Sequence, residues 1–399
     1  MKISAEGNEA ELAGSLLARA REMVPRLAER AADAERRRSI PPETIADFKQ
    51  AGLFRAIQPR RYGGYELDPG VFFDIQMTLA EGCMSSGWVY GVVGVHNWQL
   101  ALFDPRAQEE VWASDDSVLI ASSYMPKGQV ERVDSEGGFR FSGRWGFSSG
   151  VDHADWLFLG GIVASKNGAP DYRTFLVPRS DVRINDNWHT VGLKGTGSKE
   201  VVVDGAFVPE YRTHRAIDGF AGTSPGLRAN PAALFRLPFG QIFVRAVSTA
   251  SIGALQGALN AFRQYGSSRV SINDLGRTAE DPAAALAAAD AALAIDEMKL
   301  GLHRNFEAMM ATIRRGEAID INDRIHYRYQ SAAVAGRCAE HIDRIFHACG
   351  GQGLYTDNPI GRFFVDIHAA RMHYANNPEK FGRNYGGVLL GLGNTDFFI

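Results

Sequence analysis

The spacing of apolar residues along the chain changes twice, and this divides the sequence into three parts. In residues 8–115, apolar positions recur at intervals of three and four residues, as they do on one face of an amphipathic helix. Around Ser117, short runs of alternating or β-branched residues replace that period, and from Asn230 the helical period returns almost to the end. The pattern therefore predicts helices, then strands, then helices.

The middle part has the pattern of a small β domain. About six short runs of strand-forming residues occur within roughly 95 positions, among them SVLIASS, TFLVPR and KEVVVDGAFVP. Turn signals such as Glu136-Gly137-Gly138 and Asn167-Gly168 separate these runs. Short strands joined by such turns indicate an antiparallel barrel or sandwich.

Long helices are predicted for the last part of the chain. Asp281-Pro282 supplies an N-cap followed by proline at the first helical position, and the run to Gly316 is rich in alanine and leucine. Further helical runs cover Asp323–Ala348 and Pro359–Asn376, and helices of this length with apolar stripes pack as bundles. The predicted fold class is α+β, with an N-terminal all-helical domain, a central antiparallel β domain and a C-terminal four-helix bundle over residues 1–115, 116–215 and 216–399.

Composition excludes several classes of protein. The 399 residues include 43 Lys+Arg and 46 Asp+Glu, a net charge of −3 without a basic block, which argues against a nucleic-acid partner. No run of 18 apolar residues occurs, so we expect no membrane-spanning segment. The N-terminus lacks the apolar region of a secretory signal, and Cys83, Cys338 and Cys349 show no CxxC spacing. We therefore expect a cytoplasmic protein with free thiols.

Several common catalytic motifs are missing. No GxGxxG follows a predicted strand, so the sequence has no dinucleotide-binding fingerprint, and GxxxxGK[ST] and HExxH do not occur either. His368 and His373 lie about 140° apart around the axis of a predicted helix, which is a poor arrangement for two ligands of one metal ion. We predict no metal site.

Four polar features remain as candidates for a functional site. The glycine clusters at 192–198 and 350–353 could bring the backbone close to a flat ring or a phosphate, or could be tight turns. The adjacent hydroxyls of Ser148 and Ser149 lie between two predicted strands, where they could instead cap a turn. His96 stands alone in an apolar helical segment, where a structural histidine is the ordinary alternative.

Together these features resemble the acyl-CoA dehydrogenase fold, over roughly residues 10–395. GLKGTGSKEVVVDGAFVP (192–209) is similar to the flavin-side loop and strand of that fold, and FHACGGQGLYTDNPIGRFFVDIHAARMH (346–373) is similar to its GGxG segment. The resemblance implies a flavin held between the β domain and the helical bundle.

The carboxylate that the dehydrogenases require is missing. Removal of an α-proton from a thioester needs a positioned base, but the usual place after the GGxG segment falls at about Tyr374. The alternative place, on the first bundle helix, also fails because no acid occurs between Asp218 and Asp274.

The chain instead resembles a flavin-dependent monooxygenase branch of this fold, the oxygenase components of two-component phenol hydroxylases. This branch includes 4-hydroxyphenylacetate 3-hydroxylases and a hydroxylase of steroid catabolism. The segments that carry the resemblance are CMSSGWV (83–89), VGVHNWQLALFDPRAQEEVW (93–112), ASSYMP (121–126), FSSGVDHADW (147–156), DNWHTVGLKGTGS (186–198) and DIHAARMH (366–373).

On the substrate side, the resemblance implies that His96 is the base that ionises a phenol and that Ser122 orients the phenol oxygen. At Gly240, the 4-hydroxyphenylacetate enzymes have an arginine that meets the substrate carboxylate, although Arg236 and Arg245 lie close by in this sequence. A glycine at that place implies a larger and less anionic substrate, such as a polycyclic phenol.

On the cofactor side, the resemblance implies that Ser149 bonds the flavin N5 and that His373 lies near the pyrimidine side of the ring, where it stabilises the anionic reduced flavin. Gly350 and Gly351 are expected to reach the flavin of a neighbouring subunit, and Arg269 is expected at the flavin phosphates. The remaining cofactor-binding residues that it implies are Ser148, Thr196, Gly197 and Ser198.

The implied function is hydroxylation of a phenolic, polycyclic substrate ortho to its hydroxyl, through a flavin C4a-hydroperoxide formed from reduced FMN or FAD and O2. A separate NAD(P)H-dependent flavin reductase would supply the reduced flavin, in keeping with the missing dinucleotide fingerprint, and the shared flavin site implies a homotetramer. An N- or S-oxygenase of the same branch, an acyl-CoA dehydrogenase and a non-catalytic flavin carrier remain as alternatives.

Overall fold

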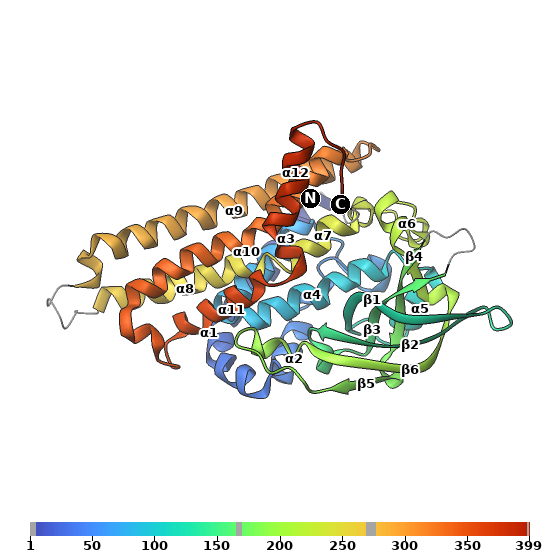
Figure 1. Cartoon of the computed structure of the whole chain (residues 1–399), viewed down its shortest axis with the longest axis horizontal. Coiled ribbons are helices and arrows are strands. Elements are labelled where there is room, and N and C mark those ends of the chain that lie inside the picture. Colours follow the sequence, from blue (N-terminus) through green and yellow to red (C-terminus); the bar gives the residue numbers. More distant parts are fainter. Residues whose placement is uncertain (1–4, 165–169, 269–276, 397–398) are drawn as a thin grey trace.

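A computed structural model shows three groups of elements in the order that the sequence predicts, and it describes residues 5–164, 170–268, 277–396 and 399 (Figure 1). The first group is helical and precedes the sheet. Its helices are α1 (Ala5–Arg37), α2 (Pro42–Gln50), α3 (Pro69–Gly82), α4 (Met84–Leu100) and α5 (Pro105–Trp112).

Helix α4 lies in the middle of the molecule, between the sheet and the later helices (Figure 1). All 17 of its residues are buried, as expected for a helix that is covered on every side. Two glycines allow this close packing. A Cβ atom on Gly91 would lie 1.9 Å from Nε2 of Gln76, and one on Gly94 would lie 2.8 Å from the ring of Phe72.

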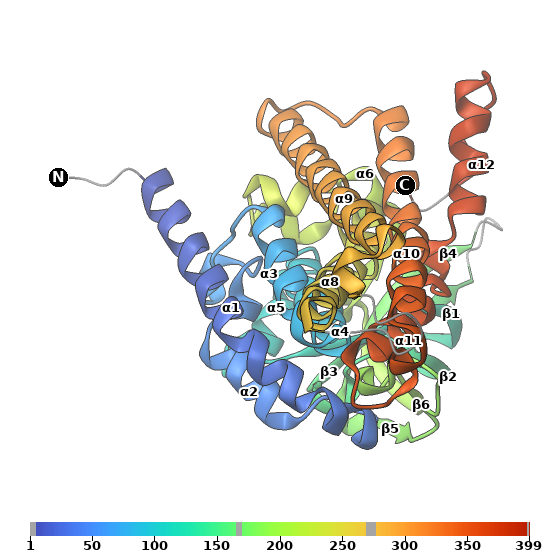
Figure 2. The same ribbon diagram turned by 90° about the vertical axis from the view of Figure 1, so that its left-hand side faces the viewer.

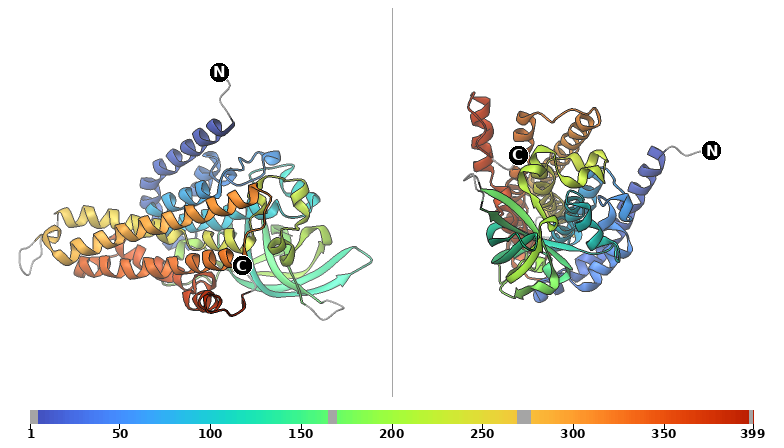
Figure 3. Two further views of the ribbon diagram at one scale, coloured as in Figure 1. Left: turned by 90° about the horizontal axis from the view of Figure 1, so that it is seen from above. Right: turned by 90° about the vertical axis from the view of Figure 1, so that its right-hand side faces the viewer.

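Within the described residues, seven strands form one sheet in the order β5-β6-β2-β1-β3-β4-β7. Figure 3 shows them grouped at one end of the molecule, with the long helices extending from the other. Short 3-10 turns join several of the strands. The strands are β1 (Ile120–Val133), β2 (Gly138–Ser148), β3 (Trp156–Val163), β4 (Asp171–Pro178), β5 (Val182–Asn185), β6 (Lys199–Pro209) and β7 (Thr213–Arg215).

The sheet is mixed, which corrects the expectation of a purely antiparallel domain. Strand β1 pairs antiparallel with β2 from Gln129 to Val133, but it pairs parallel with β3 from Ile120 to Gly128. Because β2 already lies along one edge of β1, the turn at Val151–His153 leads β3 to the other edge, in the same direction as β1. The β1–β3 register shifts between Ser123 and Gly128, as at a β-bulge.

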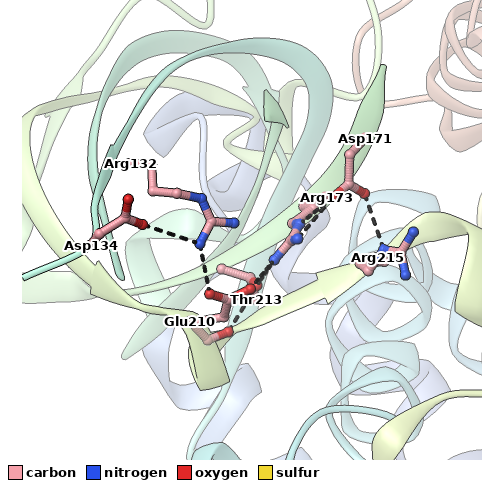
Figure 4. A network of polar contacts seen from close by, with 7 residues as sticks. All are labelled: Arg132, Asp134, Asp171, Arg173, Glu210, Thr213 and Arg215. Atoms are coloured by element: carbon pink, nitrogen blue, oxygen red, sulfur yellow. Dashed lines mark hydrogen bonds and ion pairs between the residues drawn. The ribbon is translucent and has the colours of Figure 1, made fainter. Parts of the chain in front are cut away.

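A buried arginine connects strands β1, β4 and β7 at the far edge of the sheet (Figure 4). Arg173 is nearly buried, and its guanidinium donates to Asp171 (2.8 Å), Glu210 (3.1 Å) and the Thr213 hydroxyl (3.1 Å). Glu210 also accepts from Arg132 on β1 at 3.0 Å. Buried charges are tolerated when they are paired in this way, so the network fixes this edge structurally.

The last group of helices forms the bundle, in which α9 and α10 are the long members (Figure 1). As predicted, Asp281 caps α9, since its carboxylate accepts from the N–H of Ala283 at 2.8 Å. The helices are α6 (Ala216–Ala221), α7 (Phe239–Ala246), α8 (Ala250–Ser268), α9 (Pro282–Arg314), α10 (Ile321–Cys349), α11 (Pro359–Arg371) and α12 (Pro378–Leu389).

One apolar core joins the N-terminal helices to the bundle. It runs without a break from Leu16 on α1 through α3 and α4 to Ala375, whereas one smaller core lies within the sheet and another lies between the sheet and α5. Figure 2, which looks along the bundle, shows α3 between α1 and the bundle helix α8. The stretch Phe239–Gly266 is apolar enough to cross a membrane, but 89% of the apolar window is buried inside the protein, so internal packing accounts for its composition.

Candidate active site

His96 on α4 is fully buried, and its two ring nitrogens have different surroundings. Nδ1 donates to the carbonyl oxygen of Ile120 on β1 at 2.5 Å, which leaves the lone pair on Nε2. Nε2 is buried and has no hydrogen-bond partner among the residues that the structure describes. Burial lowers the pKa of His96 to about 4, so the ring is neutral near pH 7. The result is a neutral imidazole with one unsatisfied acceptor.

Aromatic rings surround this imidazole. Phe158 on β3 meets it edge-on at 5.5 Å between ring centroids, and Phe243 on α7 lies parallel to it at 6.3 Å. Tyr124 on β1 lies at 6.2 Å and in turn contacts Phe243 at 4.9 Å and Phe239 at 5.4 Å. His96, with its free acceptor, therefore lies against the rings of Phe158, Tyr124, Phe243 and Phe239, which we call the aromatic wall.

The structure brings Ser122 and Gly240 to the same wall. Ser122 is paired with Phe158 across the β1–β3 ladder and lies two positions before Tyr124 on the same strand. Gly240 is buried at the start of α7, between Phe239 and Phe243 in sequence. Arg236 is exposed, and Arg245 follows Phe243 by two residues, which turns it about 200° around the helix, away from Phe243.

A second polar group lies where β2 ends and β6 begins. The Ser149 hydroxyl is 2.7 Å from that of Ser198, which is 2.7 Å from the Thr196 hydroxyl, and Thr196 donates to the Leu193 carbonyl at 2.7 Å. Because a carbonyl oxygen only accepts, every hydroxyl in this chain donates towards Leu193. The Ser149 oxygen then acts as an acceptor, and the indole N–H of Trp88 on α4 donates to it at 3.2 Å.

The backbone around this hydroxyl chain is held in unusual conformations. Phe147, Leu193 and Gly197 all have positive φ, of 63°, 51° and 56°. The N–H of Gly150 donates to the Thr196 carbonyl at 2.8 Å, which ties the two turns together. Positive φ at residues other than glycine is costly and is found where tertiary contacts enforce it, often at functional sites.

Ser148 is fully buried, and its hydroxyl has no hydrogen-bond partner in the described part of the chain. By contrast, the neighbouring Phe147 side chain is 68% exposed and meets the Trp188 ring edge-on at 5.9 Å. An unsatisfied buried hydroxyl beside an exposed aromatic ring indicates that these two turns accept a further group.

His373 lies close to the hydroxyl chain, because its ring meets that of Trp88 at 5.8 Å. Its Nδ1 accepts from the N–H of Ala375 at 3.1 Å, so the proton of the neutral ring is on Nε2. Burial, together with the cation of Arg328, lowers the pKa of His373 to about 4. Arg328 also donates to the Ala375 carbonyl at 2.9 Å. His373 therefore offers a donor, whereas His96 offers an acceptor.

These groups fit a reduced flavin. The ring of a reduced flavin has an N–H edge that suits the Ser149 oxygen and carbonyl acceptors that suit a histidine N–H, and the free Ser148 hydroxyl provides a further contact. The fit depends on three parts of the chain that meet only in the folded protein. They are helix α4, the turns after β2 and before β6, and the segment after α11.

Gly350 and Gly351, which were also expected to bind the cofactor, do not lie near the hydroxyl chain of the same subunit. Gly350 and Gly351 are exposed at the end of α10, and α11, 13 residues or roughly 20 Å long, separates them from His373. Gly350 has a φ of 57°, and a Cβ on Gly351 would meet nothing within 4 Å. Arg269 lies outside the described residues.

Four residues of the site were not singled out from the sequence, namely Trp88, Tyr124, Asp366 and Gln99, whose side-chain oxygen accepts from the Tyr124 hydroxyl. Each lies in a segment that carries the family resemblance, but residue type alone gives no signal of hydrogen bonding. Asp366 on α11 is buried, and its carboxylate accepts from the N–H of Leu193 at 2.5 Å. It thereby connects the bundle to the hydroxyl chain.

The fold and site define the class of the protein, a flavin enzyme with the acyl-CoA dehydrogenase fold. Residues 14–115 match the family "Acyl-CoA dehydrogenase, N-terminal domain", and residues 246–378 match "Acyl-CoA dehydrogenase, C-terminal domain".

Known relatives narrow the class. The chain is 39% identical over 381 residues to the "Flavin-dependent monooxygenase, oxygenase subunit HsaA" of Rhodococcus jostii (strain RHA1), covering 94% of this chain and 98% of the relative. It is 32% identical to the "FADH(2)-dependent resorcinol hydroxylase, oxygenase component" of a Rhizobium strain (91% and 90% covered). The crystal structure of the HsaA monooxygenase from M. tuberculosis matches with a TM-score of 0.92 and 39% identity (97% and 100% covered). The chain belongs to the oxygenase components of flavin-dependent monooxygenases.

Proposed function

We propose that this protein hydroxylates a phenolic substrate ortho to its hydroxyl group, as the oxygenase component of a two-component system. The observation that carries the proposal is the buried acceptor Nε2 of His96, which has no partner among the described residues and lies in an aromatic wall. A phenol presents a hydroxyl donor on an aromatic ring, so it matches both features of this wall.

His96 acts as the general base for the phenol. Its Nε2 accepts the phenol proton, and the resulting phenolate pushes electron density to the ortho carbon that is attacked. The low pKa of His96 keeps the ring in the accepting form before substrate binds, and the phenolate then stabilises the imidazolium by charge pairing. Ser122 hydrogen-bonds the same oxygen. General-base assistance of this kind contributes about 10²–10⁴-fold in rate.

The flavin-side residues bind the cofactor and control its protons. Reduced FMN or FAD, held beside the hydroxyl chain, would supply the electrophilic oxygen from O2. Ser149 accepts a hydrogen bond from the N5 edge, and His373 donates from Nε2 to the pyrimidine side. The backbone and hydroxyls of the two turns complete the binding surface, through Ser148, Thr196, Gly197 and Ser198.

The remaining cofactor contacts depend on neighbouring subunits. We assign Arg269 to the flavin phosphates and Gly350 and Gly351 to the flavin of an adjacent subunit in a homotetramer. A stripe of exposed leucines on α9 supports assembly, because Leu286, Leu293 and Leu300 are 60%, 59% and 62% exposed at heptad spacing. Such a stripe is typical of helices that pack against another chain.

The substrate is a large phenol with little negative charge. Gly240, Phe239 and Phe243 present no cation to the aromatic wall, Arg236 is exposed, and Arg245 lies about 200° around the helix from Phe243. A polycyclic phenol, which buries more apolar area than a small aryl acid, fits these residues better.

A separate NAD(P)H-dependent reductase provides the reduced flavin, and we place the enzyme in the cytoplasm, where the reduced nicotinamide pool lies. The division into domains at 1–115, 116–215 and 216–399 is part of the same proposal. The β domain and the bundle then meet at the flavin, while α4 carries the substrate base between them.

The decisive test is single-turnover oxidation. The protein is titrated without oxygen with reduced FMN and with reduced FAD, then mixed with O2 and a panel of monocyclic and polycyclic phenols, and the products are identified by mass. We expect ortho-hydroxylated products, most efficiently from the polycyclic phenols. Hydrogen peroxide as the sole product with every phenol contradicts the proposal and favours a flavin carrier.

Substrates of other chemical classes distinguish the remaining candidate functions. An N- or S-oxygenase of this branch would oxidise amines or sulfides and need no base at His96. An acyl-CoA dehydrogenase would reduce a bound oxidised flavin when given an acyl-CoA, and Tyr374, at the usual position of its base, is an exposed tyrosine.

A further inference from the structure

The hydroxyl chain ends on a group that can only accept. The carbonyl oxygen of Leu193 accepts from the Thr196 hydroxyl at 2.7 Å and from the indole N–H of Trp188 at 3.0 Å. Because a carbonyl has no hydrogen to donate, the hydrogen of the Thr196 hydroxyl is committed to Leu193. The N–H of Leu193 donates to Asp366, which holds this acceptor in place.

The direction of this last bond fixes the other two. The Ser198 oxygen lies 2.7 Å from the Thr196 oxygen and 2.7 Å from the Ser149 oxygen. Oxygens at this distance share a hydrogen bond, and each hydroxyl has a single hydrogen to give. Ser198 therefore donates to Thr196, and Ser149 donates to Ser198. Because Thr196 and Ser198 are buried, neither has solvent as an alternative partner. The Ser149 hydroxyl thus has only a lone pair left for a cofactor.

The oxidation state of a flavin changes the hydrogen-bonding property of N5. Reduction adds two electrons to the ring and a proton at N5, so the reduced ring carries an N–H there, whereas the oxidised ring has a lone pair. The lone pair of Ser149 accepts from the reduced ring but repels the lone pair of the oxidised one. The indole N–H of Trp88, 3.2 Å from the Ser149 oxygen, fills the second acceptor position of that hydroxyl and leaves this difference unchanged.

We propose that Thr196 and Ser198 are positioning residues that make the site select reduced over oxidised flavin, because they hold the Ser149 hydroxyl in its accepting direction. This inference rests on the proposed function, in which Ser149 meets N5. Such selection matters to an enzyme whose reduced flavin comes from a separate reductase, since the oxidised flavin left after each turnover competes for the same site. With the hydroxyl chain fixed, oxidation of the ring turns the N5 contact from attractive to repulsive and favours exchange of the spent cofactor.

The test measures dissociation constants for the oxidised and reduced forms of FMN and of FAD, without O2 or phenol, from the free flavin that passes an ultrafiltration membrane. The wild type should bind the reduced form more tightly. In Thr196→Val, Ser198 is free to donate to Ser149, which can then donate to N5 of the oxidised ring. The ratio of the oxidised to the reduced dissociation constant should therefore fall about tenfold. By linkage, the two-electron potential of the bound flavin should decrease by about 30 mV.

Further variants show whether the effect passes through Ser149. Ser198→Ala removes the acceptor of the Ser149 hydrogen and should lower the ratio as Thr196→Val does. Thr196→Ser keeps the hydroxyl and should keep the wild-type ratio. In a Ser149→Ala background, Thr196→Val should leave the ratio unchanged. Thr190→Val is the matched control, because the Thr190 hydroxyl donates to the Gly192 carbonyl at 2.9 Å in the same loop and is not part of the hydroxyl chain.

Three outcomes overturn the inference. They are equal binding of the two flavin forms by the wild type, an unchanged ratio in both Thr196→Val and Ser198→Ala, and a full Thr196→Val effect in the Ser149→Ala background. The proposed function fails in a different measurement, since it requires ortho-hydroxylated products from phenols. A protein that hydroxylates phenols and shows any of these three outcomes keeps that function and loses the selection by the hydroxyl chain.

Discussion

At the scale of single residues, two neutral histidines in the site differ in which nitrogen carries the proton. The carbonyl of Ile120 accepts from Nδ1 of His96, whereas the N–H of Ala375 donates to Nδ1 of His373. Burial lowers both pKa values to about 4. One backbone contact therefore leaves Nε2 of His96 as an acceptor, and the other leaves Nε2 of His373 as a donor, although both residues are histidines.

His96→Asn tests the first of these assignments. We expect hydroxylation of the phenol to slow by about 10²-fold or more, and the defect to shrink for phenols that bind already ionised. Rapid-quench product analysis measures the step. His214→Asn is the matched control, because His214 is also buried with a pKa of about 4 but its Nε2 is already engaged by the Ser224 hydroxyl. Normal hydroxylation in a folded His96→Asn protein would favour the N- or S-oxygenase.

Ser149→Ala tests the acceptor at the end of the hydroxyl chain. Loss of its hydrogen bond to the flavin should lower the fraction of O2 that appears in product and raise the yield of hydrogen peroxide several-fold. The ratio of product to O2 consumed is the measurement. Ser142→Ala removes a hydroxyl from β2, the strand that precedes Ser149, where it accepts from the N–H of Gly205, and should leave the ratio unchanged. Unchanged coupling in Ser149→Ala removes that serine from the cofactor site.

At the scale of elements, α11 controls the loop that carries the hydroxyl chain. Its residue Asp366 accepts from the N–H of Leu193, which has a φ of 51°, and a Cβ on Gly192 would lie 2.2 Å from the backbone oxygen of Val365. Burial raises the pKa of Asp366 from 3.8 to about 7. The loop and the helix are thus in close backbone contact around a carboxyl group that favours its protonated form.

Asp366→Asn should remove a pH dependence of stability. A carboxyl group whose pKa is higher in the folded state than in the unfolded state adds to the free energy of unfolding at low pH. For Asp366 this contribution is complete below pH 4 and is lost as the pH rises to about 7, a decrease of up to about 4 kcal/mol. The variant keeps an acceptor for Leu193 and should therefore gain stability relative to the wild type at pH 8 but not at pH 4. Denaturant unfolding at both pH values measures this difference. The exposed Asp296→Asn is the control, and an equal difference at both pH values would contradict the prediction.

At the scale of the whole molecule, the single chain leaves its expected assembly surface uncovered. Leu286, Leu293 and Leu300 are exposed along α9, a long helix of the bundle that Figure 2 shows nearly end-on. Gly350 and Gly351 lie at the end of α10, away from the hydroxyl chain of their own subunit. A tetramer would account for both features.

Leu293→Lys should therefore weaken assembly. Replacing a buried leucine by a charge in two symmetric copies costs about 3 kcal/mol or more, which corresponds to roughly a 100-fold increase in the subunit dissociation constant. Sedimentation velocity at several concentrations measures it. Ala311→Lys, exposed further along α9, is the matched control. An unchanged oligomer in Leu293→Lys would show that this stripe is not the interface.

The sequence by itself determined the order of helices, strands and helices, because the period of apolar residues follows local geometry. It also indicated the candidate residues His96, Ser149 and His373 through the segments around them. Tertiary structure alone decided the parallel pairing of β1 with β3, since that pairing depends on which edge of β1 remained open. It also decided the protonation of each histidine, because the partners of each ring come from other segments or from the local turn. Residue type fixes what a side chain can do, and packing selects which of its forms is present.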